Sequence, residues 1–93
     1  MKTVTICIGN SDNKLTQQEW SNFIERVYVV MCDRSVAVHF SGFSAGDSPW
    51  QNVCWVAEVA KEDIEPLRAE LKNVRERFKQ DSVAFTAGET EFI

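Results

Sequence analysis

Segments with strand or helix periodicity follow one another along the chain in an order that few folds accommodate. Half-buried strands are predicted where apolar and polar residues alternate, over 3–8, 36–40, 53–59 and 82–86. Apolar residues at helical spacing predict one helix from about Gln17 to Met31 and a second that follows Asp63 as its N-cap and extends to Phe78. The predicted order is therefore β-α-β-β-α-β.

This order is the split β-α-β pattern, which is also called ferredoxin-like. Right-handed crossovers place both helices on one face of a four-stranded antiparallel sheet with strand order 4-1-3-2. We expect a single α+β domain over residues 1–93, because 93 residues with 44% hydrophobic content can bury one modest core. Gly88 is expected to form a bulge, and residues 90–93 to continue the last strand.

The turn between the first strand and the first helix is the most strongly specified local structure in the sequence. Thr16 and Glu19 have the spacing of a capping box, in which each side chain accepts a hydrogen bond from the other residue's backbone amide. Leu15 and Trp20 occupy the two positions of a hydrophobic staple. The helix is therefore predicted to start at Gln17.

The topology brings three polar loops to one end of the sheet: residues 9–14, 41–52 and 80–82. We call this surface the loop end. Rigid strands that present polar loops are a common location for binding residues. The candidate site residues are Asn10, Ser11, Asp12, Lys14, Trp50, Gln51, Asn52, Gln80 and Asp81.

Competing interpretations apply to these loops. The amides of residues 9–12 precede a helix N-terminus, which favours anions, but the glycine pattern of a phosphate loop is missing and a turn built from Asx hydrogen bonds is the alternative. Asp12, Asp47 and Asp81 could converge on a cation, although without D-x-D spacing solvated acids are the simpler interpretation. Trp50 is either a binding anchor or a cap that folds back on the core.

The sheet face opposite the helices is predicted to be less polar than a solvent-facing surface usually is. Its residues include Cys7, His39, Cys54 and Val56. A contiguous patch of this kind often marks a protein interface, so we expect a homodimer through this face. His39 is the one histidine and could act as a general base, but no partner is established for it, and no catalytic residue is assigned.

Composition argues against several classes of partner. The net charge of −4 repels phosphate backbones, so nucleic acid is not expected to bind. No apolar stretch approaches the length of a membrane span, and Met1-Lys2 leads directly into a strand, so a cytoplasmic location is expected. The three cysteines lack C-x-x-C spacing, which predicts reduced, mostly buried thiols and neither a metal nor a cofactor.

Three segments carry a resemblance to a known family. They are residues 8–20 (IGNSDNKLTQQEW), 49–55 (PWQNVCW) and 80–86 (QDSVAFT), the last followed by 88–92 (GETEF). Together they resemble a family of small uncharacterised proteins of tailed phages and actinobacteria. The resemblance implies a viral or prophage accessory gene expressed inside a bacterial cell, and it brings no activity or cofactor.

The leading functional hypothesis is a non-enzymatic binding protein. On this hypothesis it is a phage-type accessory factor that engages a host protein or a small polar ligand through the loop end, and the resemblance alone implies host takeover or counter-defence as its setting. The alternative is a small enzyme acting on a nucleotide-like or other polar metabolite at the same loops, against which the missing nucleophile–base pair and metal motif stand. A third hypothesis is a purely structural dimer module.

Overall fold

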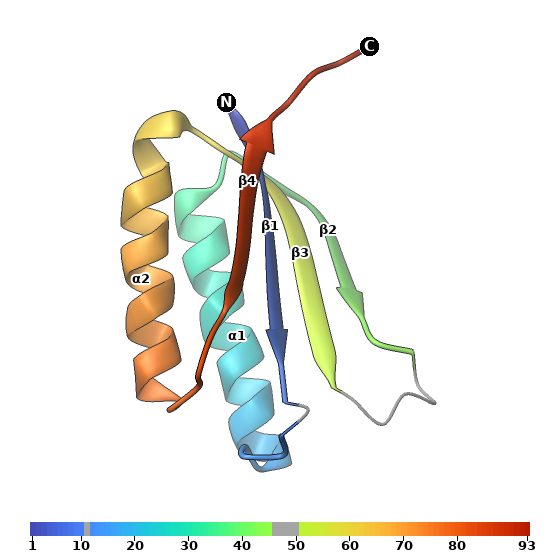
Figure 1. Cartoon of the computed structure of the whole chain (residues 1–93), viewed down its shortest axis with the longest axis vertical. Helices are drawn as coiled ribbons and strands as arrows, with labels where there is room; N and C mark the ends of the chain where they lie inside the picture. Colours follow the sequence, from blue (N-terminus) through green and yellow to red (C-terminus); the bar gives the residue numbers. More distant parts are fainter. Residues whose placement is uncertain (11, 46–50) are drawn as a thin grey trace.

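The computed structural model describes residues 1–10, 12–45 and 51–93, and within them it has one sheet and two α-helices. In chain order the elements are β1 (Lys2–Gly9), α1 (Gln17–Arg34), β2 (Ala37–Phe43), β3 (Asn52–Val59), a short 3₁₀ turn (Lys61–Asp63), α2 (Ile64–Arg77) and β4 (Ala84–Glu89) (Figure 1). The strand order is β2-β3-β1-β4 and every neighbouring pair is antiparallel. This confirms the predicted α+β fold and strand order.

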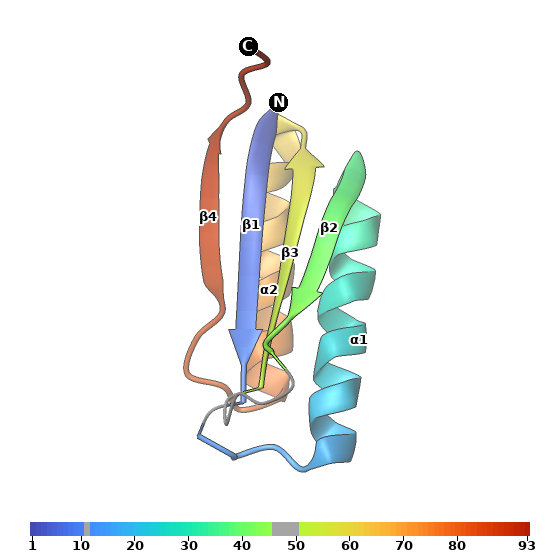
Figure 2. The same cartoon turned by 90° about the vertical axis from the view of Figure 1, so that its right-hand side faces the viewer.

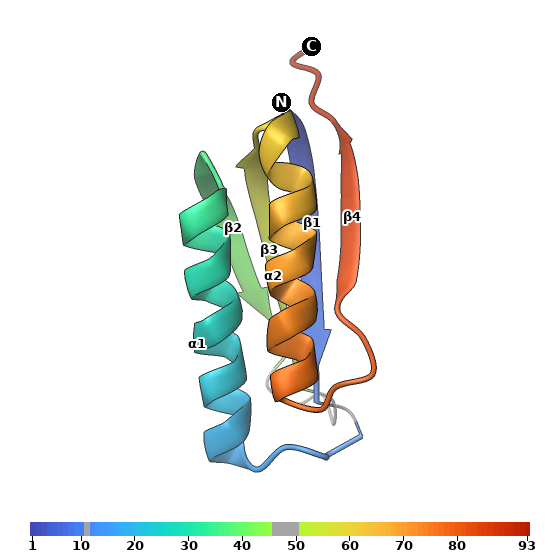
Figure 3. The same cartoon turned by 90° about the vertical axis from the view of Figure 1, so that its left-hand side faces the viewer.

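Both helices cover the same face of the sheet. Figure 3 shows α1 and α2 in front of the strands, and Figure 2 shows the strands from the opposite side with the helices behind. The described helices therefore leave the other face of the sheet open, as the topology predicts.

Neither described helix is long and apolar enough to cross a membrane.

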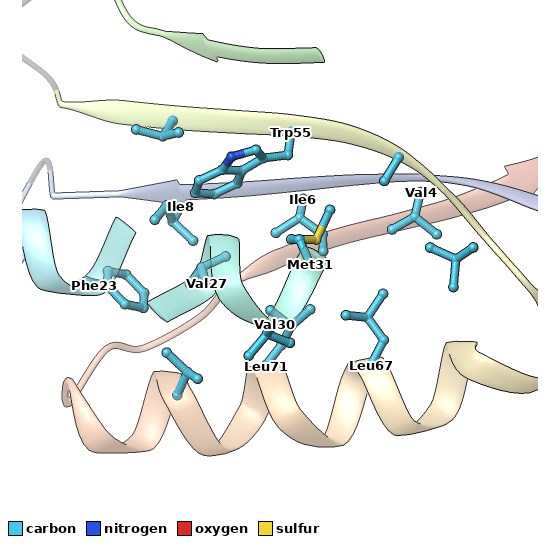
Figure 4. Close-up of a cluster of buried hydrophobic side chains, with 14 of the residues drawn as sticks. Val4, Ile6, Ile8, Phe23, Val27, Val30, Met31, Trp55, Leu67 and Leu71 are labelled. Carbon is cyan, nitrogen blue, oxygen red and sulfur yellow. The ribbon is translucent and has the colours of Figure 1, made fainter. Parts of the chain in front are cut away.

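The core lies between this helical layer and the sheet. Alternation in β1 turns Val4, Ile6 and Ile8 toward the helices, where all three are buried. Side chains from α1 and α2 meet them in the close-up of Figure 4, which includes Phe23 and Leu67. Because β1 is an inner strand of the sheet, its inward residues belong to the same core cluster as the buried residues of α1 and α2. This cluster packs the sheet against the two helices.

The N-terminus of α1 confirms the predicted capping box. The Thr16 hydroxyl accepts from the Glu19 amide at 3.2 Å, and the Glu19 carboxylate accepts from the Thr16 amide at 3.0 Å. Both staple residues, Leu15 and Trp20, are buried. The Thr16 amide lowers the pKa of the Glu19 carboxyl, so this interaction contributes most above the usual carboxyl pKa and is lost on acidification through the lowered value.

Replacing Thr16 with alanine should lower the free energy of unfolding by about 1 kcal/mol, because an amide in the first turn loses its acceptor. The measurement is the urea midpoint at neutral pH. Ser21→Ala, on an exposed position of the same helix, is the matched control and should leave the midpoint nearly unchanged. Equal midpoints for Thr16→Ala and wild type would show that the cap contributes nothing.

The C-terminus of α1 lies beyond the predicted end at Met31. The helix continues to Arg34, whose guanidinium donates to the Glu70 carboxylate of α2 at 2.9 Å. The prediction that residues 32–35 form the exit turn is therefore wrong. A contact to the other helix, which local periodicity does not show, holds the last turn in place.

The second strand differs most from its prediction. It runs from Ala37 to Phe43 and contains a bulge between Val38 and Phe40. Val38 pairs with Ala57, whose side chain is buried under the helices, whereas Phe40 pairs with Val56 on the open face. The expectation that Phe40 shares a face with Val38 is therefore wrong, because one extra residue in the bulge reverses the alternation.

The predicted N-cap of α2 is confirmed in position, and the expectations about β4 are corrected. Asp63 stands at the N-cap position, although its side chain makes no capping hydrogen bond and its carboxylate lies 3.7 Å from the Arg34 guanidinium. The last strand covers Ala84–Glu89 and not 82–86, and Gly88 pairs in regular register with Thr3, so it is not a bulge. Residues 90–93 do not continue the strand.

Candidate functional site

The loops predicted to share one end of the sheet do lie together where they are described. The Asn10 amide donates to the Gln51 carbonyl at 2.8 Å, which joins the first loop to the start of β3. The Lys14 ammonium lies 3.1 Å from the Asp81 carboxylate, which joins the first loop to the α2–β4 connection. These connections are all at the lower end of the molecule in Figure 1.

Asn10 organises the first loop from inside. The residue is 3% exposed; its carboxamide oxygen accepts from the Leu15 amide at 3.1 Å, and its Nδ2 donates to the Leu15 carbonyl at 3.1 Å. The same Nδ2 lies 3.2 Å from Gln51 Oε1. Asn10 therefore has a buried, structural position. In the same loop the Lys14 amide donates to Asp12 Oδ1 at 3.2 Å, which is the Asx-type turn given above as the alternative to an anion site.

Gln80 also lies inside its loop. It is 8% exposed, and its Nε2 donates to the Phe78 carbonyl at 3.1 Å. The preceding Lys79 has a φ of 55°, which is the left-handed conformation that commonly ends a helix. The Gln80 amide then donates to the Arg75 carbonyl at 3.0 Å, so Gln80 closes the end of α2.

Gln51 pairs with the first turn of α1. Gln51 Nε2 donates to Gln17 Oε1 at 2.8 Å, and Gln17 Nε2 donates to Gln51 Oε1 at 3.0 Å. This reciprocal amide pair is exposed to solvent at Gln17 and half-buried at Gln51. The start of β3 is therefore tied both to the first loop and to the helix that follows it.

Three exposed charged residues of the loop end, all among the described residues, form one cluster. Lys14 lies between Asp81, at 3.1 Å, and Asp12, at 3.7 Å. The hydrogen bond to Asp81 is the main reason that the pKa of Lys14 is raised, and its charge attraction adds to the effect. Because all three side chains are exposed, the cluster adds little stability and leaves one net negative charge at the surface.

A hollow of about 290 Å³ lies beside this cluster. Its lining combines loop residues with residues of the open sheet face: Cys7, Ile8, Gly9, Asp12, Asn52, Gln80, Asp81, Ser82 and Ala84. Asn52 lies over Gly9 so closely that a Cβ on Gly9 would be 2.5 Å from Asn52 Oδ1. The hollow joins the two surfaces that the sequence predicts separately.

Some predicted residues fall outside this description. Ser11 and Trp50 lie outside the described residues, as does Asp47 of the predicted cation site. The other two acids of that site, Asp12 and Asp81, both contact Lys14. Among the described residues no group of three or more His, Cys, Asp or Glu side chains is placed to hold a metal ion.

The open face is built of rows that cross the sheet. Strand register places its residues in three rows, written in the order β2, β3, β1, β4: Ala37, Glu58, Thr3, Gly88; Phe40, Val56, Thr5, Thr86; and Gly42, Cys54, Cys7, Ala84. The predicted face residues Cys7, Cys54 and Val56 lie in these rows, and His39 Nε2 reaches Glu58 Oε1 at 3.0 Å. Phe40, 70% exposed, joins this face only because of the bulge, for which the sequence carries no local signal.

The cysteines differ from the prediction of mostly buried thiols. Cys32 is exposed, and Cys7 and Cys54 are half-buried, so that prediction is wrong. The Cys7 and Cys54 sulfurs lie 3.2 Å apart. Burial, followed by the contact with Cys7, raises the pKa of the Cys54 thiol to about 11.

Comparison with known proteins supports the fold. No protein-family model matches the chain, and no curated protein does. A dimeric ferredoxin-like protein of unknown function from Thermobifida fusca YX has a TM-score of 0.64 at 6% identity, over 97% of this chain and 92% of that one. The de novo designed protein Foldit4 has a TM-score of 0.57 at 15% identity, over 97% of this chain and 96% of the design.

A third solved structure is similar over nearly the whole chain. It is a dimeric ferredoxin-like protein from an uncultured marine organism, with a TM-score of 0.50 at 12% identity, over 99% of this chain and 90% of that one. At such low identities these similarities concern the fold alone. The chain is an α+β protein with the ferredoxin-like fold.

Proposed function

We propose that the chain is a non-enzymatic binding protein that acts as a homodimer and holds a small polar ligand in the hollow at the loop end. The observation that carries the proposal is the continuity of this hollow with the open sheet face. Cys7 and Ala84 line it from the sheet, and Asp12 and Asp81 line it from the loops. A second copy seated on the sheet would then adjoin the hollow.

Pairing through the open face is supported by what that face contains. Phe40 and Val56 form an apolar centre, and the residues around them are mostly small or uncharged. An aromatic side chain exposed on an uncovered sheet is typical of an interface and not of a solvated face. Two solved proteins of the same fold are described as dimeric.

Charge and position favour binding over catalysis at the hollow. Its acidic rim favours an uncharged or cationic polar ligand over a phosphate-bearing one. The one histidine contacts Glu58, which lies six residues along β3 from Asn52 at the rim, roughly 20 Å away at about 3.4 Å per residue. The alternative of a small enzyme would have to work without that histidine.

A setting inside a bacterial cell, as a phage or prophage accessory factor in host takeover or counter-defence, is proposed from the resemblance of the three signature segments alone. In that setting the partner could also be a host protein at the loop end. Recovery of the protein from bacterial lysate distinguishes these cases, because a small ligand and a protein partner differ in mass.

Dimerisation is tested by placing a charge at the centre of the open face. Wild type should sediment as a dimer and Val56→Lys as a monomer, since pairing would bury an unpaired ammonium. Val29→Lys is the matched control, because it makes the same change at an exposed position of α1 and should leave the dimer intact. A wild type that stays monomeric at high concentration contradicts the proposed dimer.

Ligand binding is tested by native mass spectrometry of protein isolated from bacterial lysate. Wild type should carry a small polar molecule, and the double variant Asp12→Ala, Asp81→Ala should lose it while its urea midpoint changes little. The control variant Glu62→Ala, Glu65→Ala removes two acids in and just before the first turn of α2, which lies at the opposite end of the molecule from the loop end (Figure 1), and it should retain the molecule. A double variant that keeps the molecule contradicts the assignment of the site.

A further inference from the structure

One row of the open face consists of two neighbouring cysteines with a glycine on one side and an alanine on the other. In order across the sheet the row is Gly42, Cys54, Cys7 and Ala84. A Cβ placed on Gly42 would have no heavy atom within 4 Å, so the space beside Cys54 is open. The two sulfurs, 3.2 Å apart, therefore lie in the same row as this open space, which we call the trough.

The hydrogen-bond pattern shows what kind of cross-strand pair the cysteines form. Asn10 and Gln51 face each other, and the Asn10 amide donates to the Gln51 carbonyl, so they are a hydrogen-bonded pair. Such pairs alternate with non-hydrogen-bonded pairs along an antiparallel ladder. Counting back in the register, Gly9 with Asn52 is non-hydrogen-bonded, Ile8 with Val53 is hydrogen-bonded, and Cys7 with Cys54 is non-hydrogen-bonded.

A non-hydrogen-bonded pair brings its two side chains closest together, with Cα atoms about 4.5 Å apart. This separation lies inside the range of about 4.4–6.8 Å that disulfides span. The sulfurs already face each other, and closing their gap to a bond of about 2.05 Å takes side-chain rotation and not movement of a strand.

We propose that Cys7 and Cys54 are a thiol–disulfide couple, which closes a cross-strand disulfide by exchange with a low-molecular-weight aliphatic disulfide. One cysteine, as the thiolate, attacks a reagent sulfur and releases the first reagent thiolate, which takes up a proton. The second cysteine then attacks the protein sulfur of the mixed disulfide and releases the second reagent thiol. In total the protein loses two protons and two electrons, and these convert the reagent disulfide into two thiols.

Two features of the site set the rate of this exchange. The reagent reaches the sulfurs from the open face through the trough beside Gly42. The raised pKa of Cys54 keeps its thiolate scarce at neutral pH, and the thiolate fraction grows about tenfold per pH unit below the pKa. Exchange should therefore quicken as the pH rises.

The inference goes beyond the proposed function and does not depend on it. If copies pair through the open face, pairing covers the trough, so the exchange belongs to the separate protomer. The experiment is therefore run at a dilution at which sedimentation gives the monomer mass. Failure of the exchange in that monomer concerns the cysteines alone, and failure to dimerise concerns the proposed function alone.

The test uses Cys32→Ser, in which Cys7 and Cys54 are the only thiols. After incubation of the folded, dilute protein with oxidised glutathione at alkaline pH, the intact mass should fall by two hydrogens with no adduct. A non-reducing peptide map should join the segments that contain Cys7 and Cys54, and the oxidised form should have a higher urea midpoint, since the bond links residues 47 apart.

Two matched variants keep only one cysteine of the couple, so neither can carry out the second attack. Cys7→Ser and Cys54→Ser, each combined with Cys32→Ser, should stop at a single glutathione adduct or at the free thiol. The inference is overturned if folded Cys32→Ser keeps two free thiols or stable adducts in excess reagent. It is equally overturned if the bond links two chains, or if it forms only when urea unfolds the protein.

Discussion

Phe23→Ala is expected to lower the free energy of unfolding by about 3–5 kcal/mol, which is a large part of the stability of a domain this size. Phe23 is fully buried in α1, and its ring centroid lies 5.1 Å from that of Phe78 and 6.2 Å from that of Trp20. Removal of the ring leaves a cavity where α1, the end of α2 and the sheet meet. Urea unfolding followed by far-UV circular dichroism measures the loss.

Tyr28→Ala is the matched control for this prediction. It truncates an aromatic ring on the same helix at a position that is 46% exposed, so the cost should be a fraction of that for Phe23. Similar losses for the two variants would show that the buried cluster around Phe23 is not the main source of stability in this part of the core.

Asn10→Ala has the second large expected effect. The substitution removes the partner of both the amide and the carbonyl of Leu15, and Leu15 is buried. Each buried polar group left without a partner costs about 1–3 kcal/mol, so the expected loss for the two groups is roughly 2–6 kcal/mol. Asn22→Ala, which removes the same side chain from an exposed position of α1, should change the urea midpoint little.

Asn10→Asp separates the hydrogen-bonding role of Asn10 from its shape. An aspartate keeps an acceptor for the Leu15 amide but turns a second oxygen toward two acceptors, the Leu15 carbonyl and Gln51 Oε1. This raises the carboxyl pKa in the folded state, so the variant should lose stability as the pH rises past about 3.9, the usual value. A variant as stable as wild type at neutral pH would contradict the structural role assigned to Asn10.

The fold could be predicted from sequence because its periodic segments agree with its local signals. Alternation in β1 and the capping box before α1 both act over a few residues, and the structure confirms them. The end of α1 could not be predicted in this way, since Arg34 is held by Glu70, a residue of the other helix. The bulge in β2 also depends on pairing with β3, and the residues around His39 carry no sequence signal that predicts it.

The candidate site divides along the same line. Topology alone places the loops at one end of the sheet, and the contacts of Lys14 with Asp81 agree with it. Sequence reasoning could not tell which polar side chains remain accessible, because burial of Asn10 and Gln80 depends on how each loop folds back on its own backbone. The facing of Cys7 and Cys54 depends on the register of β1 and β3, which the pattern of apolar residues limits but does not state.

The bulge in β2 also makes the two outer strands of the sheet unequal. An outer strand offers unpaired backbone groups to which a strand of another chain can add, and a bulge disrupts that template. On the β2 side the irregularity between Val38 and Phe40 interrupts the row of such groups. On the β4 side the described register from Ala84 to Glu89 is regular, with a charged side chain only at its last residue. Unwanted strand addition, and aggregation that grows from it, would therefore start at β4.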